Sequence, residues 1–325
     1  MTGTGPQPAD LHFPALVNGL DFLVSAVGSL SGDDGQPGPR DMKYAVLHLQ
    51  AAAETLLKAR LEMHDPALVW TKVELFDQRK HEAGDFKSCG VKTAIERLRD
   101  TVRIESTIDP EDAGLRALGS LRNRIMHFGL KDTVLAVQAR TVPVLDLLVG
   151  FINTDILPQV HETDEAWSVE QHMEQVRDGF KHLTDFLALR METLRSRLDG
   201  YESSTASCRS CGQFTVVLDA GAQDLACLLC ARQYGTGEDA SWEFVGSSKH
   251  VSITDGGGDL NGCSSCGAYS VISTPLASSP EEDSWICFDC GSTYEGVCTF
   301  CDQAAELVPD MDMCGDCYEI RLANF

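Results

Sequence analysis

The chain has 325 residues and a formal net charge of −23. This length is enough for two or three domains and for a sizeable core in at least one of them. The charge is uneven: residues 1–200 carry 22 basic and 30 acidic residues, whereas residues 201–325 carry 4 and 19. Because the phosphates of nucleic acid would be repelled there, this composition disfavours a nucleic-acid-binding role for residues 201–325.

The opening of the chain and its cysteine usage predict a soluble cytoplasmic protein without membrane association. The first residues lack the basic region of a secretory signal, and no uninterrupted apolar run approaches the roughly 18 residues of a membrane span. Twelve of the thirteen cysteines lie after residue 200, all in Cys-x-x-Cys pairs. In a reducing compartment, thiols with this spacing are more often metal ligands than disulfides.

Apolar periodicity predicts an all-helical bundle over residues 1–200. Residues 11–30 predict a buried first helix, and in residues 40–64 apolar side chains recur with the 3.6-residue period over several turns. Residues 65–90 are irregular, with Trp70, Val73, Phe76 and Phe86 expected to pack against the bundle and Cys89 expected to be an inert, half-buried thiol. The remaining predicted segments are helices at 91–102, 131–152 and 166–199, a joint at 153–165 and a linker at 201–207.

One further helix has marked boundaries at both ends. Asp109-Pro110-Glu111-Asp112 offers an N-cap, a proline in the first turn and carboxylates near the positive helix end. Gly129 suits the position just past the helix end. The residues expected to face the core are Leu121, Ile125 and Phe128.

The last turns of this helix carry an arginine, an amide and a histidine. Asn123 and His127 are one turn apart on the same face, and Arg122 lies beside that face. These side chains are compatible with an acid–base site. They are also compatible with a solvated helix face that ends in a capping histidine.

The order Arg-Asn-x-x-x-His resembles the signature of the HEPN superfamily. The resemblance extends from about Leu16 to about Leu198 and includes Tyr44–Ala59, which is similar to the core helix that precedes the motif in that family. It implies a helical bundle that forms a homodimer, in which the motif helices of two protomers line one composite cleft. It also implies metal-independent cleavage of RNA in that cleft.

The resemblance assigns catalytic roles to Arg122, Asn123 and His127. The histidine can take a proton from a ribose 2′-hydroxyl or give one to the leaving oxygen, and the arginine can hold the charge of the phosphorane. The asparagine would orient the phosphate or the imidazole. Arg124 and Lys131 are expected to contact RNA phosphates. Glu54 and Lys58, on the long helix, would either support the site indirectly or form a plain surface ion pair.

Other functions remain open at this point. One family branch carries a tyrosine two residues after the histidine as a target for nucleotidyl modification, but Gly129 stands there, so no modifying partner is expected. The main alternative is a non-catalytic HEPN scaffold that binds nucleotide or RNA while residues 201–325 dock a protein. A zinc-ribbon transcription or translation adaptor is a further alternative, which the acidic composition disfavours.

Six Cys-x-x-Cys pairs predict three β-rich, metal-stabilised zinc ribbons at residues 208–250, 251–295 and 296–325. Two residues between thiols allow a tight turn to direct both sulfurs at one tetrahedral ion, and Gly212, Gly267 and Gly291 each directly follow such a pair. Structural disulfides and redox dithiols are the alternatives. The predicted ligand sets are Cys208, Cys211, Cys227 and Cys230; Cys263, Cys266, Cys287 and Cys290; and Cys298, Cys301, Cys314 and Cys317.

The predicted cofactor is therefore about three structural zinc ions per chain. With four thiolates each, such sites are closed, so metal chemistry is not expected to be the catalysis. Because only seven residues separate Cys290 from Cys298, interleaved ligation also remains open. Each site adds about two negative charges, which favours either a protein partner or an acidic surface that covers the site of the bundle.

Overall fold

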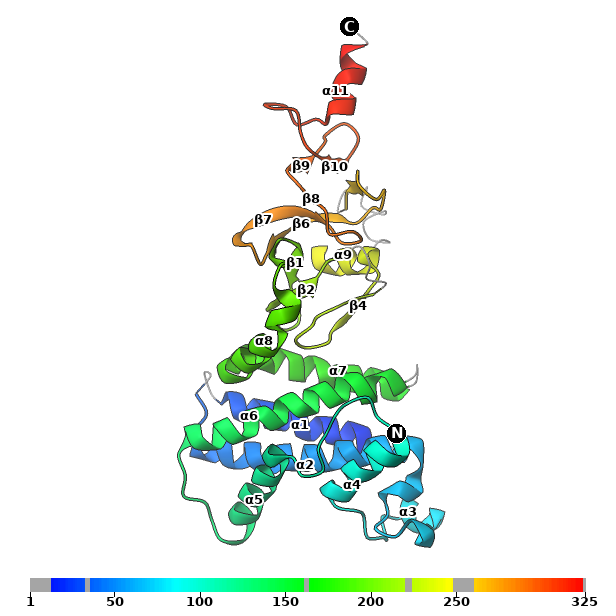
Figure 1. Cartoon of the computed structure of the whole chain (residues 1–325), viewed down its shortest axis with the longest axis vertical. Coiled ribbons are helices and arrows are strands. Elements are labelled where there is room, and N and C mark those ends of the chain that lie inside the picture. The colour runs from blue at the N-terminus through cyan, green and yellow to red at the C-terminus, as the bar shows by residue number, and fades with distance from the viewer. Residues whose placement is uncertain (1–12, 33–35, 161–163, 220–223, 248–259, 324–325) are drawn as a thin grey trace, which may run out of the picture. The chain divides into compact units, whose positions relative to one another are not determined.

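The computed structural model of the protein describes residues 13–32, 36–160, 164–219, 224–247 and 260–323. The chain divides into two compact units, Met1–Ala188 and Leu189–Phe325, here named the helical unit and the cysteine-rich unit. The N-terminal region is mostly helical and the C-terminal region is β-rich, as the composition and periodicity predict (Figure 1).

The helical unit is built from long helices joined by short 3₁₀ and π turns. Its helices are α1 (Ala15–Ser31), α2 (Pro39–His64), α3 (Gln78–Glu82), α4 (Val91–Arg97), α5 (Ala113–His127), α6 (Val134–Phe151), α7 (Asp164–Gly179) and α8 (Thr184–Leu198), and α8 crosses the division into the second unit. The predicted helices at 11–30 and 40–64 correspond to α1 and α2, so the two strongest periodic patterns are confirmed.

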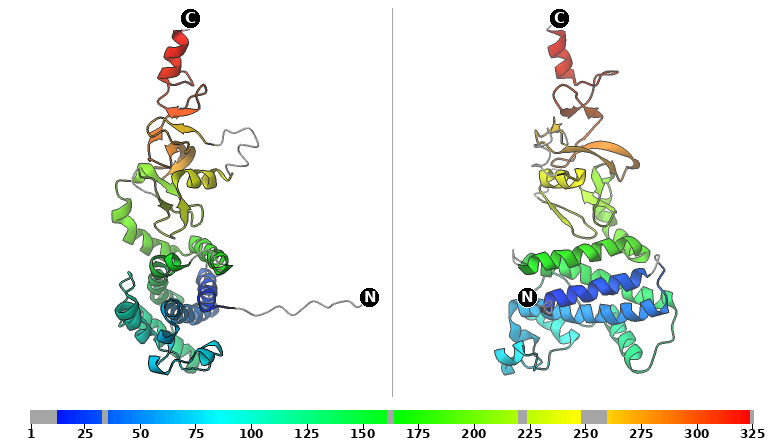
Figure 2. Two further views of the ribbon diagram at one scale, coloured as in Figure 1. Left: turned by 90° about the vertical axis from the view of Figure 1, so that its right-hand side faces the viewer. Right: turned by 180° about the vertical axis from the view of Figure 1, so that it is seen from behind.

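Helix α2 is the centre of the helical unit, because it packs against α1, α4, α5 and α6 (Figures 1 and 2). Asp41 caps its first turn by accepting a 2.8 Å hydrogen bond from the backbone N–H of Gly38. Its buried face is almost entirely aliphatic and consists of Met42, Ala45, Val46, Leu49, Gln50, Ala52, Ala53, Leu56, Leu57, Ala59 and Leu61. This face holds the surrounding helices through apolar burial.

Two glycines allow the helices to approach closely. A Cβ atom at Gly19 of α1 would lie 2.8 Å from Leu56 Cδ2 of α2, and one at Gly179 of α7 would lie 2.3 Å from Val27 Cγ1 of α1. Gly179 also ends α7. The chain then passes through the 3₁₀ turn η7 (Phe180–His182) into α8, so the prediction of one helix over 166–199 was wrong. The buried Phe180 explains the break, since η7 turns its ring into the core.

The boundaries of α5 differ in detail from the prediction. Asp112 is the N-cap and accepts a 2.8 Å hydrogen bond from Leu115 N, so Pro110 precedes the helix instead of lying in its first turn. At the other end Gly129 has φ +85° and its N–H reaches Arg124 O at 2.6 Å, which confirms it as the residue past the helix end. Phe128 already leaves the helical conformation and is 88% exposed, so its predicted core position was wrong.

The segment before α5 is held by a buried carboxylate. Asp155, which is 5% exposed, accepts hydrogen bonds from Glu105 N at 2.7 Å and Ser106 N at 3.1 Å. Its own carbonyl accepts from Arg60 Nε of α2 at 2.8 Å. The connection between α4 and α5 is thereby tied to the centre of the bundle.

In the irregular segment 65–90, the three aromatic side chains that were expected to pack against the bundle pack on one another. Trp70 stacks on Phe86 with ring centroids 4.8 Å apart and meets Phe76 edge-on at 5.6 Å. Val73 is 36% exposed and so does not belong to this group. Cys89 is buried, not half-buried, and burial raises the pKa of its thiol, which fits an inert side chain.

The span Val134–Gln159, which contains α6, is long and apolar enough to cross a membrane. Half of its most apolar window is buried inside the bundle, as in the core helix of a globular domain. Its length and composition are therefore weak evidence for membrane insertion.

In the cysteine-rich unit, short strands are interlinked across the predicted ribbon boundaries. The strands are β1 (Thr205–Ser207), β2 (Phe214–Val217), β3 (Leu225–Ala226), β4 (Gln233–Gly235), β5 (Gly262–Cys263), β6 (Val271–Leu276), β7 (Ser279–Cys287), β8 (Thr293–Tyr294), β9 (Gly296–Val297) and β10 (Gln303–Ala305), with helices α9 (Gly237–Val245) and α11 (Gly315–Leu322). One sheet has the order β2-β1-β6-β7-β8, a second β5-β10-β9, and β3 pairs with β4.

The pairing of β1 with β6 joins the first two ribbons in one sheet, with Ala206 opposite Leu276. The parallel pairing of β10 with β5 joins the second ribbon to the third. Beside the first sheet, Phe244 of α9 meets Phe288 edge-on at 4.8 Å, and Tyr234 lies 5.3 Å from Phe244. The three ribbons are thus linked by backbone pairing and aromatic packing within one unit.

Candidate metal centres and candidate active site

Five of the six Cys-x-x-Cys pairs adopt one repeated backbone turn. The residue after the second cysteine has positive φ, and its N–H donates to the carbonyl of the first cysteine at 2.8–2.9 Å. The φ values are 73° at Gly212, 54° at Ala231, 78° at Gly267, 71° at Gly291 and 54° at Asp302. The expectation that glycine relaxes this turn is confirmed at the three predicted positions. The sixth pair instead begins α11, with Cys314 as its N-cap.

These turns bring the cysteines together in the three predicted sets, so the ligation is consecutive along the chain and not interleaved. Within each set the four sulfur atoms lie within 4.8 Å of one another. Pairs of sulfurs are 3.6–3.8 Å apart, for example Cys208 with Cys230 at 3.6 Å and Cys301 with Cys314 at 3.8 Å. A tetrahedral zinc ion with Zn–S bonds of about 2.3 Å requires sulfurs about 3.8 Å apart. The chain therefore has fitting ligand sets for three structural zinc ions.

The sulfurs of the first site are close enough to shift one another's pKa: hydrogen bonding with Cys211 lowers the pKa of Cys208, whereas hydrogen bonding with Cys208 raises the pKa of Cys230. Four sulfurs at these distances can all be thiolates only if a cation shares their charge. All four positions of the tetrahedron are occupied by protein, so each site is closed to water and substrate.

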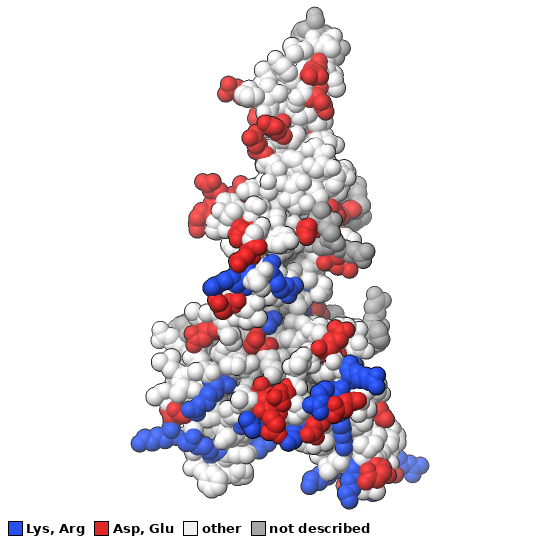
Figure 3. Space-filling model, in the orientation of Figure 1, with Lys and Arg blue, Asp and Glu red and all other residues white. Residues whose placement is uncertain are grey.

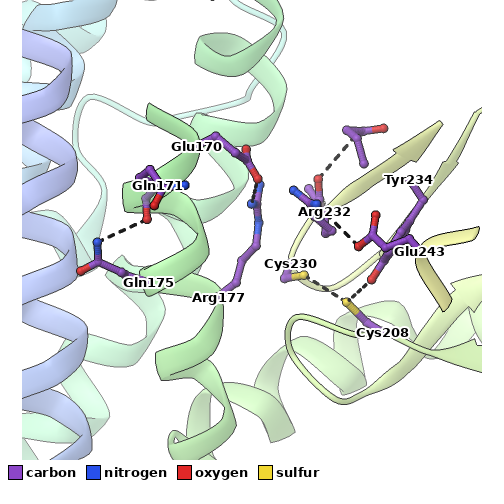
Figure 4. A network of polar contacts seen from close by, with 11 residues as sticks. Glu170, Gln171, Gln175, Arg177, Cys208, Cys230, Arg232, Tyr234 and Glu243 are labelled. Carbon is purple, nitrogen blue, oxygen red and sulfur yellow. Dashed lines mark hydrogen bonds and ion pairs between the residues drawn. The ribbon is translucent and has the colours of Figure 1, made fainter. Parts of the chain in front are cut away.

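Two tyrosines contact the first ligand of their site, and both lie four residues after its last cysteine. Tyr234 Oη is 3.1 Å from Cys208 Sγ and accepts from Arg209 N at 3.0 Å, and Figure 4 shows this group together with Cys230. Tyr294 Oη is 2.8 Å from Cys263 Sγ. This equal spacing of four residues is visible in the sequence, so it could have identified both tyrosines as neighbours of the metal ligands. In the third site this position is Arg321, which lies over the ring of Phe300 at 3.8 Å.

The surface of the cysteine-rich unit is acidic, as the composition predicts. Figure 3 shows acidic side chains at several places on its visible face, whereas most of the visible basic side chains belong to the helical unit. Arg232, one of the few basic residues, pairs with Glu243 at 3.5 Å (Figure 4). Nothing in this distribution offers a basic track for nucleic acid on the described face.

In the helical unit, α1, α2 and α5 line an open cavity of about 570 Å³. Two of the three predicted catalytic residues line it, and three further polar side chains come from α2. The lining residues are Phe22, Leu47, His48, Gln50, Ala51, Glu54, Arg122, Met126 and His127. The cavity thus combines a guanidinium, two imidazoles, a carboxylate and an amide with apolar side chains.

Arg122 and His127 are placed by the last turns of α5. Arg122 is half-buried and its Nη1 donates to Asn123 Oδ1 at 2.8 Å. Asn123 itself is exposed and does not line the cavity, so its contact with Arg122 suits a residue that positions the guanidinium. His127 is exposed at the helix end, with its ring 6.2 Å from that of Phe128.

Helix α2 faces this pair with three polar side chains. His48 Nδ1 lies 2.8 Å from Ser25 Oγ of α1. Glu54 accepts from Lys58 at 2.6 Å, so the predicted ion pair exists and its carboxylate also lines the cavity. Gln50 is 8% exposed, and among the described residues its Oε1 is buried without a hydrogen-bond partner. Opposite it, α5 presents Gly119, whose Cβ would lie 3.8 Å from that oxygen.

The two predicted RNA contacts, Arg124 and Lys131, are exposed and lie outside this cavity. Arg124 contributes to lowering the pKa of Asp132, although the backbone N–H of Thr133 has the larger effect. A second, smaller cavity of about 310 Å³ lies beside these residues, and its lining includes Lys43, Ile125 and Asp132.

His48 is not among the predicted site residues, although it lies within Tyr44–Ala59. The residue stands on a helix whose periodicity was recognised, but its place opposite Arg122 and His127 depends on how α2 packs against α5. Its spacing of six residues from Glu54 gives no helical-face signal, because neither three- nor four-residue steps connect the two.

We predict that the three metal sites differ in how fast they lose zinc. All four cysteines of the first site are buried, whereas Cys266 and Cys301 of the other two are exposed. A chromogenic chelator should therefore remove about two ions quickly and the third slowly, with zinc content measured by elemental analysis before and after. Cys301→Ser should remove one ion from the fast phase, and the matched Cys211→Ser should remove the slow phase.

Release of all ions at one rate, or fewer than two ions per chain at the start, would contradict this assignment. Circular dichroism provides the control. The helical signal of the helical unit should persist after zinc removal, while strand structure in the cysteine-rich unit should be lost because metal binding and folding are coupled in such small domains.

Comparison of the chain with protein-family models, with curated proteins and with solved structures finds no match.

Proposed function

We propose that the helical unit is a HEPN-like, metal-independent endoribonuclease in which Arg122 and His127 act directly on the scissile phosphate. The observation that carries this proposal is that both side chains line one cavity of about 570 Å³. Two residues that lie close together on a helix need not line the same cavity. Most exposed arginine and histidine side chains line no shared cavity.

The chemistry of RNA transphosphorylation matches these groups. The 2′-hydroxyl attacks the adjacent phosphorus, the 5′ oxygen leaves, and the products are a 2′,3′-cyclic phosphate and a 5′-hydroxyl. An imidazole can transfer a proton in this step, and a guanidinium can donate paired hydrogen bonds to the charged phosphorane oxygens. Asn123 holds Arg122 through the 2.8 Å contact, and Arg124 and Lys131 would contact phosphates of the RNA beyond the cavity.

The second protomer of the proposed homodimer would pack near the end of α5. Three apolar side chains there are strongly exposed: Met126 at 59%, Phe128 at 88% and Leu135 at 73%. Exposed aromatic and methionine side chains that lie close together are typical of protein–protein contacts, because burying their apolar surface away from water is favourable. A contact at this place would bring the two copies of His127 close to the interface.

The cysteine-rich unit is proposed to dock a protein partner with a basic surface. Its zinc sites are closed, so they supply no catalytic metal, and its acidic surface disfavours RNA. The alternative role, restraint of the nuclease by an acidic cover, makes a different prediction for a shortened chain.

We predict that wild-type protein cleaves a labelled RNA in the presence of a magnesium chelator and leaves 2′,3′-cyclic phosphate ends. His127→Ala should lower the cleavage rate by about 10²–10⁴-fold because a positioned proton transfer is lost. Arg122→Ala should lower it by about 10²–10³-fold because charge stabilisation is lost. The matched control is Arg116→Ala, an exposed arginine of the same helix that pairs with Glu111 outside the cavity.

Cleavage by His127→Ala at the wild-type rate would refute the proposal. Products with 5′-phosphate ends would indicate a different mechanism. RNA binding without any cleavage by wild type would favour the non-catalytic scaffold.

For the dimer, we predict that Phe128→Asp shifts the protein from dimer to monomer in sedimentation velocity at micromolar concentration, since a charge would be placed in an apolar contact. Leu75→Asp is the control, because Leu75 is 60% exposed in the same unit but outside the apolar patch. A wild-type protein that sediments as a monomer would exclude this contact.

For the cysteine-rich unit, we predict that a chain ending at Gly200 cleaves RNA at the rate of the full chain across a salt series. This shortened chain retains the whole helical unit. A faster rate at low salt that converges with the full-length rate at high salt would instead show restraint, since exposed charges are screened over about 8–10 Å at physiological ionic strength.

A further inference from the structure

We propose that His48 is the second acid–base group of this site and acts from the same chain as His127. This inference rests on the proposed ribonuclease function and adds a catalytic residue to it. His48 belongs to α2, and it lines the same cavity as His127 and Arg122 of α5. Each chain would then hold a complete pair of imidazoles without the second copy of His127 in a dimer.

The position of His48 is fixed on several sides. Its Nδ1 lies 2.8 Å from Ser25 Oγ of α1. Its ring centroid lies 6.3 Å from that of Phe22 and 5.8 Å from that of Tyr44. The ring is half-buried, and the contact with Ser25 leaves Nε2 as the nitrogen available to a ligand. A histidine with one nitrogen held by a hydrogen bond has a defined ring orientation, which proton transfer requires.

The reaction needs a group that accepts a proton and another that donates one. When Ser25 Oγ accepts the Nδ1–H of His48, Nε2 is unprotonated and can take the proton of the ribose 2′-hydroxyl. The 2′ oxygen then forms its bond to phosphorus while the bond from phosphorus to the 5′ oxygen breaks. The leaving 5′ oxygen takes a proton from His127, so the protons and electrons balance without water or a metal.

The positions of the two imidazoles fit this division of roles. His127 lies in the last turn of α5 and lines the cavity together with Arg122. His48 lies inside α2 on the same cavity, and its contact with Ser25 leaves Nε2 free for the 2′-hydroxyl. Arg122 would bind the phosphate between them.

Few other titratable groups face His48. Helix α2 contributes Tyr44, whose ring it contacts, and Glu54, which shares the cavity but pairs with Lys58. Helix α5 contributes Arg122 and His127. The contacts from α1 are Ser25 and Phe22, which do not titrate near neutral pH, while Asp21 of α1 lies 4.0 Å from His172 of α7 instead.

The test compares His48→Ala and His48→Asn with wild type in the full zinc-loaded protein. Both variants should cleave RNA about 10²–10⁴-fold more slowly, since the proton acceptor is lost. His48→Asn can still hydrogen-bond Ser25, so it separates loss of chemistry from loss of folding, and thermal unfolding checks that both variants remain folded. The control is His64→Ala, an exposed histidine in the last turn of the same helix.

Two readouts distinguish a catalytic from a structural role. In wild type, kcat/KM should be bell-shaped in pH: it rises as the acceptor loses its proton and falls as the donor loses its own. His48→Asn should lose the rising limb and keep the falling one. A uridine 3′-(4-nitrophenyl phosphate) substrate, whose leaving group needs no proton, should restore much of the activity of His127→Ala but none of that of His48→Asn.

Each possible outcome decides the matter. If His127→Ala is inactive while His48→Asn cleaves RNA at the wild-type rate, the ribonuclease function stands and the role of His48 is refuted. If His48→Asn is slow but keeps both limbs of the pH profile, its role is structural and the inference is also refuted. If wild type does not cleave RNA, both proposals fail together.

Discussion

Burial of one face of α2 is the constraint on which the arrangement of the helical unit depends. Eleven residues of this helix are buried, and the helix contacts four others. The close approach at Gly19 brings α1 against α2, so Ser25 reaches His48 from one side. The packing of α5 brings Arg122 and His127 to the other side. The candidate site therefore consists of polar side chains at the border of an aliphatic core, which holds their backbones in place.

The cysteine-rich unit is stabilised in a different way. Most of its strands are two to four residues long, and such strands bury too little apolar area to be stable by themselves. Three tetrahedral thiolate sets supply fixed points between them, and β1 with β6 and β5 with β10 connect one ribbon to the next. Metal coordination therefore stabilises this unit, as apolar burial stabilises the helical unit. Because stability comes from the metal sites, the surface can be strongly acidic without loss of the fold.

The features that follow from local spacing could be read from the sequence. The helices α1 and α2 follow from apolar periodicity, and the three cysteine sets follow from the repeated Cys-x-x-Cys spacing with its glycines. Features that depend on distant contacts could not be read. Phe128 fits the core-facing stripe of a longer helix, but Gly129 ends α5 and exposes it. Likewise, the break after Gly179 accompanies burial of Phe180 in the core, which the local sequence pattern does not reveal.

The same distinction applies to the candidate site. Arg122 and His127 were recognised because they lie on one helix at a suggestive spacing. Asn123 was placed with them on the ideal helical face, whereas it lies outside the cavity and accepts a hydrogen bond from Arg122, which lines the cavity. His48 and Ser25 belong to other helices and share no periodic pattern with α5, so only tertiary packing reveals them.

The order of ligands and strands along the chain has a consequence for biosynthesis. The four cysteines of each zinc set lie within a short stretch of the chain. The first set, for example, uses only residues 208–230. The sheet that contains β1 needs β6, which ends at Leu276, and β5 needs β10, which ends at Ala305. During translation a metal can thus be captured by the first ribbon before its sheet partner has been synthesised. Zinc capture by the first ribbon would then precede the pairing of β1 with β6 in the maturation of this unit.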